Sequence, residues 1–289
     1  MGDVELVGLY WTLSGPVDVH VGREWSLFAF EDRCAEAAKV GFDGIGIWHA
    51  DLAHLLETHS LKDLKATLDA AGLKHLELEF LMDWFLDPGD RRREQADRQR
   101  RFLFDAAAVL EPHHLKVGNI PAHEAPLEQV TERFAELCAD AAEHHGAKIA
   151  YELMPFDPNV RTLDDVMAVA AGAGAPNGGI AIDTWHMGKL GIAPDDLRRV
   201  PLEHLAWVEL SDGQYEDMAD PVDETINHRR LPGEGEFDVA GYVAVLRDMG
   251  YAEPWGVEVL SEDLRNLPFE EIYQRAYETT SAQFRAGVR

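Results

Sequence analysis

Four acidic residues interrupt short apolar segments in the second half of the sequence. They are Glu152, Asp183, Glu209 and Glu258, within or at the end of segments 148–153, 180–183, 205–212 and 255–260. An unpaired charge is costly inside a protein, so each of these acids needs a hydrogen-bonding partner or a cation. Oxygen-rich sites suit hard divalent ions such as Mg or Mn. The four acids therefore predict one shared cation site, although Asp183 taken alone could equally cap the turn that follows it.

Apolar segments typical of strands alternate with amphipathic segments typical of helices along the whole chain. The predicted strands are 4–11, 42–48, 73–81, 114–118, 148–153, 180–183, 205–212 and 255–260. The predicted helices are 31–40, 61–71, 90–110, 127–145, 163–171, 194–200, 239–249 and 270–285. This alternation predicts a parallel sheet that closes into a (β/α)8 TIM barrel of the α/β class. No linker divides the chain, so we expect a single domain over residues 1–289. Active sites of this fold lie at the C-terminal ends of the strands, where the four acids fall.

Composition restricts the classes of partner. The chain has 289 residues, 46% of them hydrophobic, which is enough for a sizeable core, and a net charge of -27. Nucleic acids and anionic membranes bind through cationic contacts, so neither is an expected partner. The arginine-rich stretch 91–101 is interleaved with acids and predicts a solvated helix face. No apolar run approaches the roughly 18 residues of a membrane span. Cys34 and Cys138 predict buried free thiols, and the sequence favours a cytoplasmic location.

With these features assembled, the sequence resembles the xylose-isomerase-like superfamily of barrels. This superfamily comprises sugar isomerases and epimerases that include tagatose 3-epimerase, inosose isomerase and hydroxypyruvate isomerase. The resemblance covers nearly the full length and is most specific after residue 148. The matching segments are 151–153, 182–186, 208–213, 229–238, 250–251 and 255–258. Each segment alone is weak evidence, whereas the ordered set is strong.

The resemblance implies roles for individual residues. It implies that Glu152, Asp183 and Glu258 bind the metal ion. Glu152 and Glu258 are also implied to move the carbon-bound proton of the substrate. His186 and Arg229 are implied to contact hydroxyl or carbonyl oxygens of the substrate.

The sequence departs from the family pattern at Glu209, where most relatives have histidine. Glu209 lies between Val208 and Leu210 inside a predicted strand, where alternation can direct it into the barrel. We expect Glu209 to bind the metal in place of the histidine, which favours Mg or Mn over Zn. The alternative is that His186 or His228 coordinates the ion while Glu209 hydrogen-bonds the substrate.

Other residues have two interpretations. His49, at the end of the second predicted strand, is equally consistent with a substrate-binding residue and with a hydrogen-bonded wall residue. Glu79 could bind a substrate hydroxyl or pair with a cation from the adjacent strand, such as Lys116. Asp212 is interpreted as a turn residue rather than a ligand. The aromatic residues interpreted as packing rather than as sugar platforms are Trp11, Trp48, Trp84, Phe85 and Trp185.

These features predict an enzyme, a divalent-metal-dependent isomerase or epimerase of a small carbohydrate or cyclitol that acts through an enediolate. No glycine-rich phosphate cradle follows the strands, so we expect an unphosphorylated polyol or keto-sugar. Segment 214–236 predicts a lid over the barrel mouth. One alternative is a dehydratase or lyase that expels a β-oxygen from a keto-sugar, an inosose or a 3-keto-glycoside. Two further alternatives are a metal-free binding protein and an apurinic endonuclease, for which the chain lacks a basic face. A homo-oligomer is compatible with the sequence.

Overall fold

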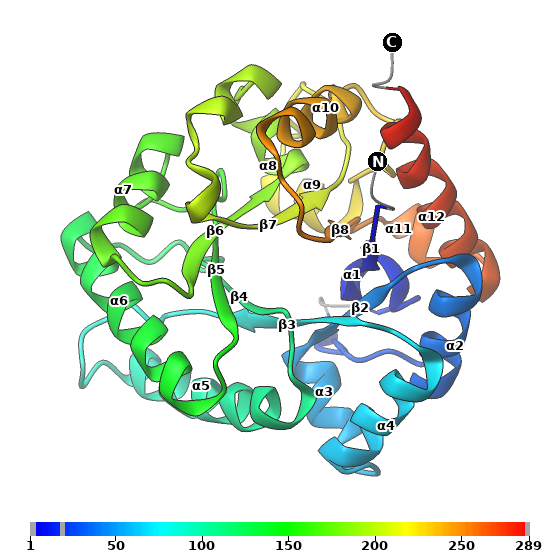
Figure 1. Ribbon diagram of the computed structural model, residues 1–289, viewed down its shortest axis with the longest axis horizontal. Coiled ribbons are helices and arrows are strands. Elements are labelled where there is room, and N and C mark those ends of the chain that lie inside the picture. The colour runs from blue at the N-terminus through cyan, green and yellow to red at the C-terminus, as the bar shows by residue number, and fades with distance from the viewer. Residues whose placement is uncertain (1–3, 18–20, 287–289) are drawn as a thin grey trace.

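Short apolar strands pair with one another in sequence order. The computed structural model describes residues 4–17 and 21–286. Within them eight parallel strands close into a barrel, in which the last strand pairs with the first (Figure 1). The strands are β1 (Leu6–Gly8), β2 (Gly44–Trp48), β3 (His75–Leu81), β4 (His114–Val117), β5 (Lys148–Glu152), β6 (Gly178–Asp183), β7 (Leu205–Leu210) and β8 (Trp255–Val257). The predicted (β/α)8 barrel is confirmed.

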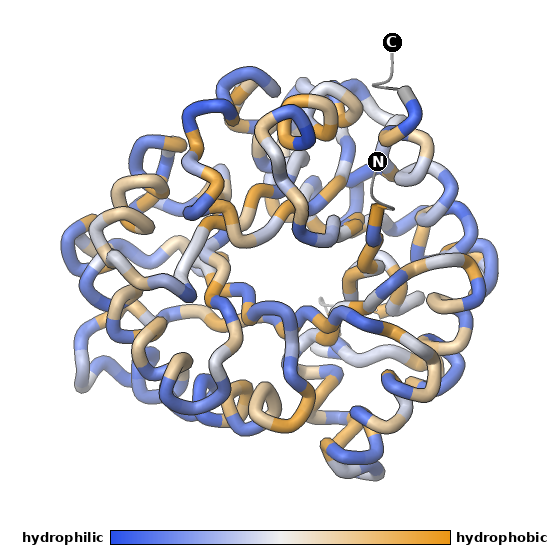
Figure 2. Tube along the Cα trace, in the orientation of Figure 1, coloured by the Kyte–Doolittle hydropathy of each residue, from blue (hydrophilic) through white to orange (hydrophobic). Residues whose placement is uncertain are grey.

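Helices surround the barrel, and the outer side of this ring is largely hydrophilic (Figure 2). The α-helices are α1 (Tyr10–Leu13), α2 (Phe30–Val40), α3 (His49–Leu55), α4 (Leu61–Ala71), α5 (Arg91–Leu110), α6 (Leu127–His144), α7 (Leu163–Ala173), α8 (Thr184–Lys189), α9 (Pro221–Asn227), α10 (Val239–Met249), α11 (Glu262–Arg265) and α12 (Phe269–Ala286). Two 3-10 helices, η2 (Pro194–Arg199) and η3 (Leu202–His204), connect α8 to β7. The last helix, α12, packs against β1 and α2 and completes the ring (Figure 1).

Side chains along each strand alternate between the outer core and the barrel interior. In β5, Ile149 and Tyr151 belong to the core between strands and helices, whereas Ala150 belongs to a cluster inside the barrel. The ring of Tyr151 contacts that of Trp84, with centroids 5.3 Å apart. These outward contacts fix the strand, and the same alternation directs Glu152 inward.

Helix ends follow the signals in the sequence. The Ser60 Oγ accepts a hydrogen bond from the Asp63 backbone N–H at 3.2 Å, and the Asp63 Oδ2 accepts one from the Ser60 N–H at 2.8 Å. This reciprocal cap begins α4. Gly72 ends the helix with a φ of 76°, a left-handed conformation that glycine adopts without a Cβ clash. The ends of α4 are as predicted, which places the β3 strand that follows.

The predicted elements and the structure differ mainly in the segments after the strands. β1 ends at Gly8 rather than at residue 11, because the chain turns into α1 at Tyr10. Four further α-helices of the described residues were not predicted: α3, α8, α9 and α11, which have 7, 6, 7 and 4 residues. Helices of one or two turns are too short to produce a clear apolar periodicity. One of them, α9, lies within segment 214–236 and begins at Pro221, after the capping residue Asp220.

Both cysteines, Cys34 and Cys138, are buried free thiols, as predicted. Burial raises the pKa of each thiol to about 12, so neither is a reactive thiolate near neutral pH. Among the residues that the structure describes, none of the helices combines the length and the apolar composition that crossing a membrane requires.

Candidate active site

The four acids that the sequence predicts at one site do converge. Glu152 and Asp183 end β5 and β6, Glu209 is the penultimate residue of β7, and Glu258 directly follows β8. Asp183 pairs in register with Glu209 across the sheet. One carboxylate oxygen from each of the four lies within 4.8 Å of the others. All four side chains are buried, because they point into the narrow interior of the barrel.

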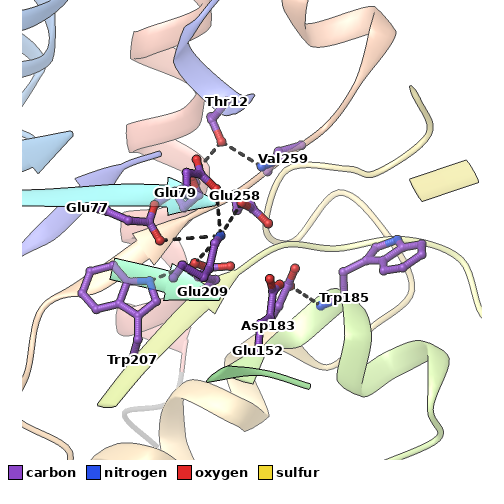
Figure 3. A network of polar contacts seen from close by, with 12 residues as sticks. Thr12, Glu77, Glu79, Glu152, Asp183, Trp185, Trp207, Glu209, Glu258 and Val259 are labelled. Carbon is purple, nitrogen blue, oxygen red and sulfur yellow. Dashed lines mark hydrogen bonds and ion pairs between the residues drawn. The ribbon is translucent and has the colours of Figure 1, made fainter. Parts of the chain in front are cut away.

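A buried lysine lies among these acids. Lys116 of β4 is 0% exposed, and its Nζ donates hydrogen bonds to Glu209 Oε1 at 2.8 Å and to Glu258 Oε1 at 2.6 Å. The same Nζ is 3.2 Å from Glu79 Oε2. Figure 3 shows the side chains of Glu77, Glu79, Glu209 and Glu258 pointing toward one another in the barrel. The predicted pairing of Glu79 with Lys116 is therefore present, and Lys116 also supplies a cation for Glu209.

A second buried cation, Arg229, lies on the other side of the acids. Its Nη1 donates to Asp183 Oδ2 at 2.6 Å and lies 3.4 Å from Glu258 Oε2. The guanidinium carbon is 4.7 Å from the ring centroid of Trp185, a cation–π contact that holds the side chain. Asp183 Oδ1 accepts from the Trp185 backbone N–H at 2.8 Å (Figure 3). Asp183 therefore caps α8 through one oxygen, while its other oxygen accepts from Arg229 beside the acids.

His186 reaches the acids from α8. Its Nε2 is 3.0 Å from Glu152 Oε1 and 3.6 Å from Asp183 Oδ2. Burial lowers the pKa of His186 to about 4, so the ring is neutral at pH 7. Its Nδ1 is buried and has no hydrogen-bond partner among the described residues. The structure thus places His186 beside the acids, where it can donate to or accept from a bound molecule.

Burial and neighbouring charges set the protonation of the acids. Burial, followed by the charge of Glu258, raises the pKa of Glu209 well above its usual range. Burial raises the pKa of Glu152 to about 7. For Glu258, burial acts in the same direction, but the charges of Lys116 and Arg229 outweigh it and lower the pKa. The acids are therefore not all ionised at neutral pH unless a further cation joins them.

The residues present fit a divalent cation. Around the site, the buried carboxyl groups of the described residues outnumber the buried permanent cations: Glu77, Glu79, Glu152, Asp183, Glu209 and Glu258 surround Lys116 and Arg229. In addition, Glu209 Oε2 is buried without a hydrogen-bond partner in the described part of the chain. Ionised carboxylates are the ligands that hard divalent ions prefer, and such an ion would balance the excess negative charge. Two smaller groups also offer ligand atoms within 4.8 Å of one another: Glu152, Asp183 and His186, and Glu77, His114 and Glu209.

The site forms the floor of a cavity of about 640 Å³ at the C-terminal ends of the strands. The polar residues of this floor are Glu79, Lys116, Glu152, His186, Arg229 and Glu258. His49 lies in the cavity wall, where its Nδ1 accepts from the Phe80 backbone N–H at 3.3 Å. Both interpretations of His49 are therefore compatible with its position. Residues of α9 also line the cavity, so part of segment 214–236 borders the barrel mouth as predicted.

Asp212 has a structural role, as predicted. Its two carboxylate oxygens accept hydrogen bonds from the backbone N–H groups of Gly213, Gly233, Gly235 and Phe237, over distances of 2.8, 2.9, 3.0 and 3.0 Å. These bonds fold the end of segment 214–236 back onto β7.

His228 does not join the acids of the site, because its Nε2 is 3.0 Å from Asp223 Oδ2 and its side chain is 38% exposed. Of the two alternative histidine ligands, the structure brings only His186 to the site.

The aromatic residues divide into two groups. Trp84 and Phe85 pack in the core between sheet and helices, and Trp185 packs against Arg229, as the packing interpretation requires. Trp11 and Trp48 instead line the cavity. These two tryptophans therefore also face the space where a ligand can bind, which the packing interpretation does not include.

Sequence reasoning missed the central position of Lys116 and the layer below it. Lys116 Nζ lies 3.5 Å from Glu77 Oε1, and that oxygen is 3.1 Å from His114 Nε2. Trp207 Nε1 donates to Glu209 Oε1 at 3.0 Å. The available signal was the two-residue spacing of His114 and Lys116 within an apolar strand, which directs both side chains into the barrel.

Comparisons with known proteins agree with this architecture. A family model described as xylose isomerase-like TIM barrel matches residues 34–282. The 3-dehydroshikimate dehydratase of Pseudomonas putida is 27% identical over 238 residues, which are 82% of this chain and 37% of the dehydratase. This chain thus spans well under half the length of that relative. Inosose isomerase of Bacillus velezensis is 24% identical over 251 residues, covering 84% of this chain and 88% of the isomerase. The crystal structure of the IOLI protein with bound zinc has a TM-score of 0.81 at 21% identity, over 96% of this chain and 97% of that one, which shows a shared fold.

Proposed function

Because the chain belongs to the xylose isomerase-like TIM-barrel family, we propose that it is a divalent-metal-dependent isomerase or epimerase of a small carbohydrate or cyclitol. One observation carries the proposal: Glu152, Asp183, Glu209 and Glu258 bring carboxylate oxygens within 4.8 Å of one another, and two of them, Glu152 and Glu258, line a cavity. An oxygen-rich set of this kind favours Mg or Mn. The similarity to a relative named inosose isomerase, whose name gives a cyclitol ketone as its substrate, supports the substrate class.

Glu152, Asp183, Glu209 and Glu258 would hold the ion. When bound, the ion supplies Lewis acidity, which polarises a carbonyl oxygen and acidifies the neighbouring C–H. Glu152 and Glu258 then act on the carbon-bound proton as base and acid. Because they come from β5 and from the end of β8, they approach the cavity floor from different strands. Removal by one and return by the other gives epimerisation, whereas removal and return by the same acid gives isomerisation.

The remaining polar residues of the floor would orient the substrate. Arg229 is held by Asp183 and Trp185, which leaves its guanidinium fixed at the cavity edge. His186 presents a neutral ring beside Glu152. Both residues can hydrogen-bond to substrate hydroxyl or carbonyl oxygens, in line with the roles that the family resemblance implies. The Lys116 ammonium, which donates to Glu258, would add positive charge at the cavity floor for negative charge that develops on the substrate.

The proposal is tested by proton exchange with solvent. The protein is supplied with Mn²⁺ and incubated in D2O with a panel of keto-sugars and inososes, and NMR follows the hydrogen on the carbon next to the carbonyl. We expect deuterium at that carbon in substrate or product, and none with Glu152→Gln or Glu258→Gln. Turnover without any solvent deuterium would contradict proton removal by these acids and would indicate hydride transfer instead.

A second candidate reaction is β-elimination of water or an alcohol from the same enediolate. It is favoured by the similarity to the Pseudomonas putida dehydratase. It is also favoured by the ammonium of Lys116 at the cavity floor, because a leaving oxygen needs a nearby hydrogen-bond donor. The same incubations distinguish the two reactions by mass spectrometry. Isomerisation or epimerisation preserves the substrate mass, whereas elimination yields a product lighter by the expelled molecule.

A further inference from the structure

The cavity has two parts of different chemistry. Its floor carries the charged residues of the site, whereas its upper wall is mostly apolar. The upper wall is formed by residues from the end of β2, from segments that follow other strands, and from α9: Trp11, Trp48, Met82, Ile120, Phe156 and Val222. A ligand that fills the whole cavity therefore has to be polar at one end and apolar at the other.

The aromatic part of this wall is fixed in place. The rings of Trp11 and Trp48 meet edge to face, with centroids 4.9 Å apart at 64°. Trp48 also stacks on Phe80 at 6.2 Å. Its Nε1 donates to Glu24 Oε2 at 2.7 Å, which holds the indole against rotation. A rigid aromatic surface is suited to a flat apolar group, because little side-chain entropy is lost on contact.

Each of three polar side chains in the upper part already makes at least one hydrogen bond. Glu24 accepts from Trp48, and His49 accepts from the Phe80 N–H. The Oγ1 of Thr225 accepts from Arg229 Nη2 at 3.1 Å. A second sugar ring placed here would bury hydroxyl groups with few partners, which is costly, whereas an apolar group would not.

The volume of the cavity also exceeds the need of one sugar ring. A monosaccharide has about 12 non-hydrogen atoms, and at about 30 Å³ for each, the share of one liquid water molecule, it fills at most about 360 Å³. The cavity measures about 640 Å³. At its rim, Ile120 and Val222 are 44% and 61% exposed, so apolar surface continues from the wall to the opening. An apolar substituent on the ring would cover this surface.

We propose that the cavity takes a polyhydroxylated ring carrying a planar apolar substituent, such as an aryl glycoside or its keto form. The hydroxylated ring lies on the carboxylate floor, and the substituent lies against Trp11 and Trp48. This proposal rests on the proposed function for the placement of the ring and adds the class of substrate.

The test compares ligands that differ only in the substituent. Binding of phenyl and methyl β-D-glucopyranosides and galactopyranosides, and of cellobiose, is measured by calorimetry on the protein supplied with Mn²⁺. Burial of one phenyl ring predicts that the phenyl glycoside of at least one sugar binds about tenfold or more tightly than its methyl counterpart. Cellobiose is expected to bind no better than the methyl glycoside.

Two variants test whether the preference for phenyl over methyl glycosides depends on the apolar upper wall of the cavity. Trp11→Ala should reduce the phenyl preference to about threefold or less by removing the aromatic contact. Ile120→Ser changes only an exposed rim residue, so it tests the same wall with little risk to folding, and it should weaken binding of the phenyl glycoside alone. Leu202→Ser is the matched control, because Leu202 is 38% exposed in η3, which precedes β7 and does not line the cavity. This control should leave the preference unchanged.

The proposal is overturned if no phenyl glycoside binds, if phenyl and methyl glycosides bind equally, or if cellobiose binds more tightly than either. It is also overturned if both wall variants keep the full preference. Failure of the proposed function is a separate result. Solvent exchange in an unsubstituted inosose without phenyl preference contradicts the substituent site only, whereas phenyl preference without exchange in any keto-sugar contradicts the reaction only.

Discussion

Replacing Lys116 with methionine removes the cation on which four buried carboxyl groups converge. Its Nζ is 2.6 Å from Glu258 Oε1, 2.8 Å from Glu209 Oε1, 3.2 Å from Glu79 Oε2 and 3.5 Å from Glu77 Oε1. Methionine keeps a similar length and shape, so the lost charge dominates the effect. Removal of one partner from a buried ion pair costs about 3–5 kcal/mol. We therefore expect Lys116→Met to lower the free energy of unfolding by about 3–5 kcal/mol near pH 7 in the presence of a chelator.

Urea unfolding followed by tryptophan fluorescence and circular dichroism measures this loss. Lys148→Met is the matched control: Lys148 lies in the neighbouring strand, its Nζ is 3.0 Å from Glu253 Oε2, and its side chain is 39% exposed. An exposed pair contributes about 1 kcal/mol or less, so the control should change little. Adding Mn²⁺ should restore part of the stability of Lys116→Met, because an ion that binds only the folded state stabilises it. A chelated Lys116→Met protein that is as stable as the Lys148→Met control would refute the account of Lys116 as the central counter-ion.

Three further predictions concern metal affinity, the pH dependence of stability, and the hydrogen bonds by which Asp212 holds segment 214–236. Glu209→Gln should weaken Mn²⁺ binding about tenfold, or about 1.4 kcal/mol, in calorimetric titrations, and an unchanged Kd would leave Glu209 only as the partner of Lys116. Burial lowers the pKa of His113 to about 4, below its unfolded value near 6.5, so its contribution to stability is present above pH 6.5 and is lost as the pH falls toward 4. Between pH 7 and 5.5 this histidine should account for about 1 kcal/mol of lost stability, and a His113→Gln protein that loses as much as the wild type would contradict that assignment. Asp212→Ala should expose segment 214–236 to protease, because four backbone N–H groups lose their acceptor, and an unchanged cleavage pattern would show that other contacts hold the segment.

Part of the site was predictable because it depends on strand alternation and on strand ends. Each of Glu152, Asp183 and Glu209 breaks an apolar run, and a parallel barrel brings all strand ends to one face. The pairing of Lys116 with Glu209 and Glu258 could not be predicted from strand alternation or strand ends. These residues are 93 and 142 positions apart in the sequence, and their contact depends on side-chain length across the interior of the barrel.

The short elements at the barrel mouth were also beyond sequence reasoning. Segment 214–236 is rich in acids and turn residues, yet it contains α9, which begins after the side-chain cap of Asp220. The sequence alone favours a packing role for Trp11, and it does not show whether a tryptophan near a strand faces the core or an opening. The early turn into α1 at Tyr10 places Trp11 beside Trp48 at the cavity. Such placements depend on loop geometry, which composition and periodicity do not encode.

We propose that the four converging carboxylates of Glu152, Asp183, Glu209 and Glu258 form a divalent-cation site. Anomalous diffraction at the manganese absorption edge, from crystals of the protein supplied with Mn²⁺, tests it most directly. We predict one anomalous peak enclosed by the carboxylates of Glu152, Asp183, Glu209 and Glu258. A crystal with no peak at this position, or with the ion bound instead between Glu77 and His114 in the layer below, would contradict it.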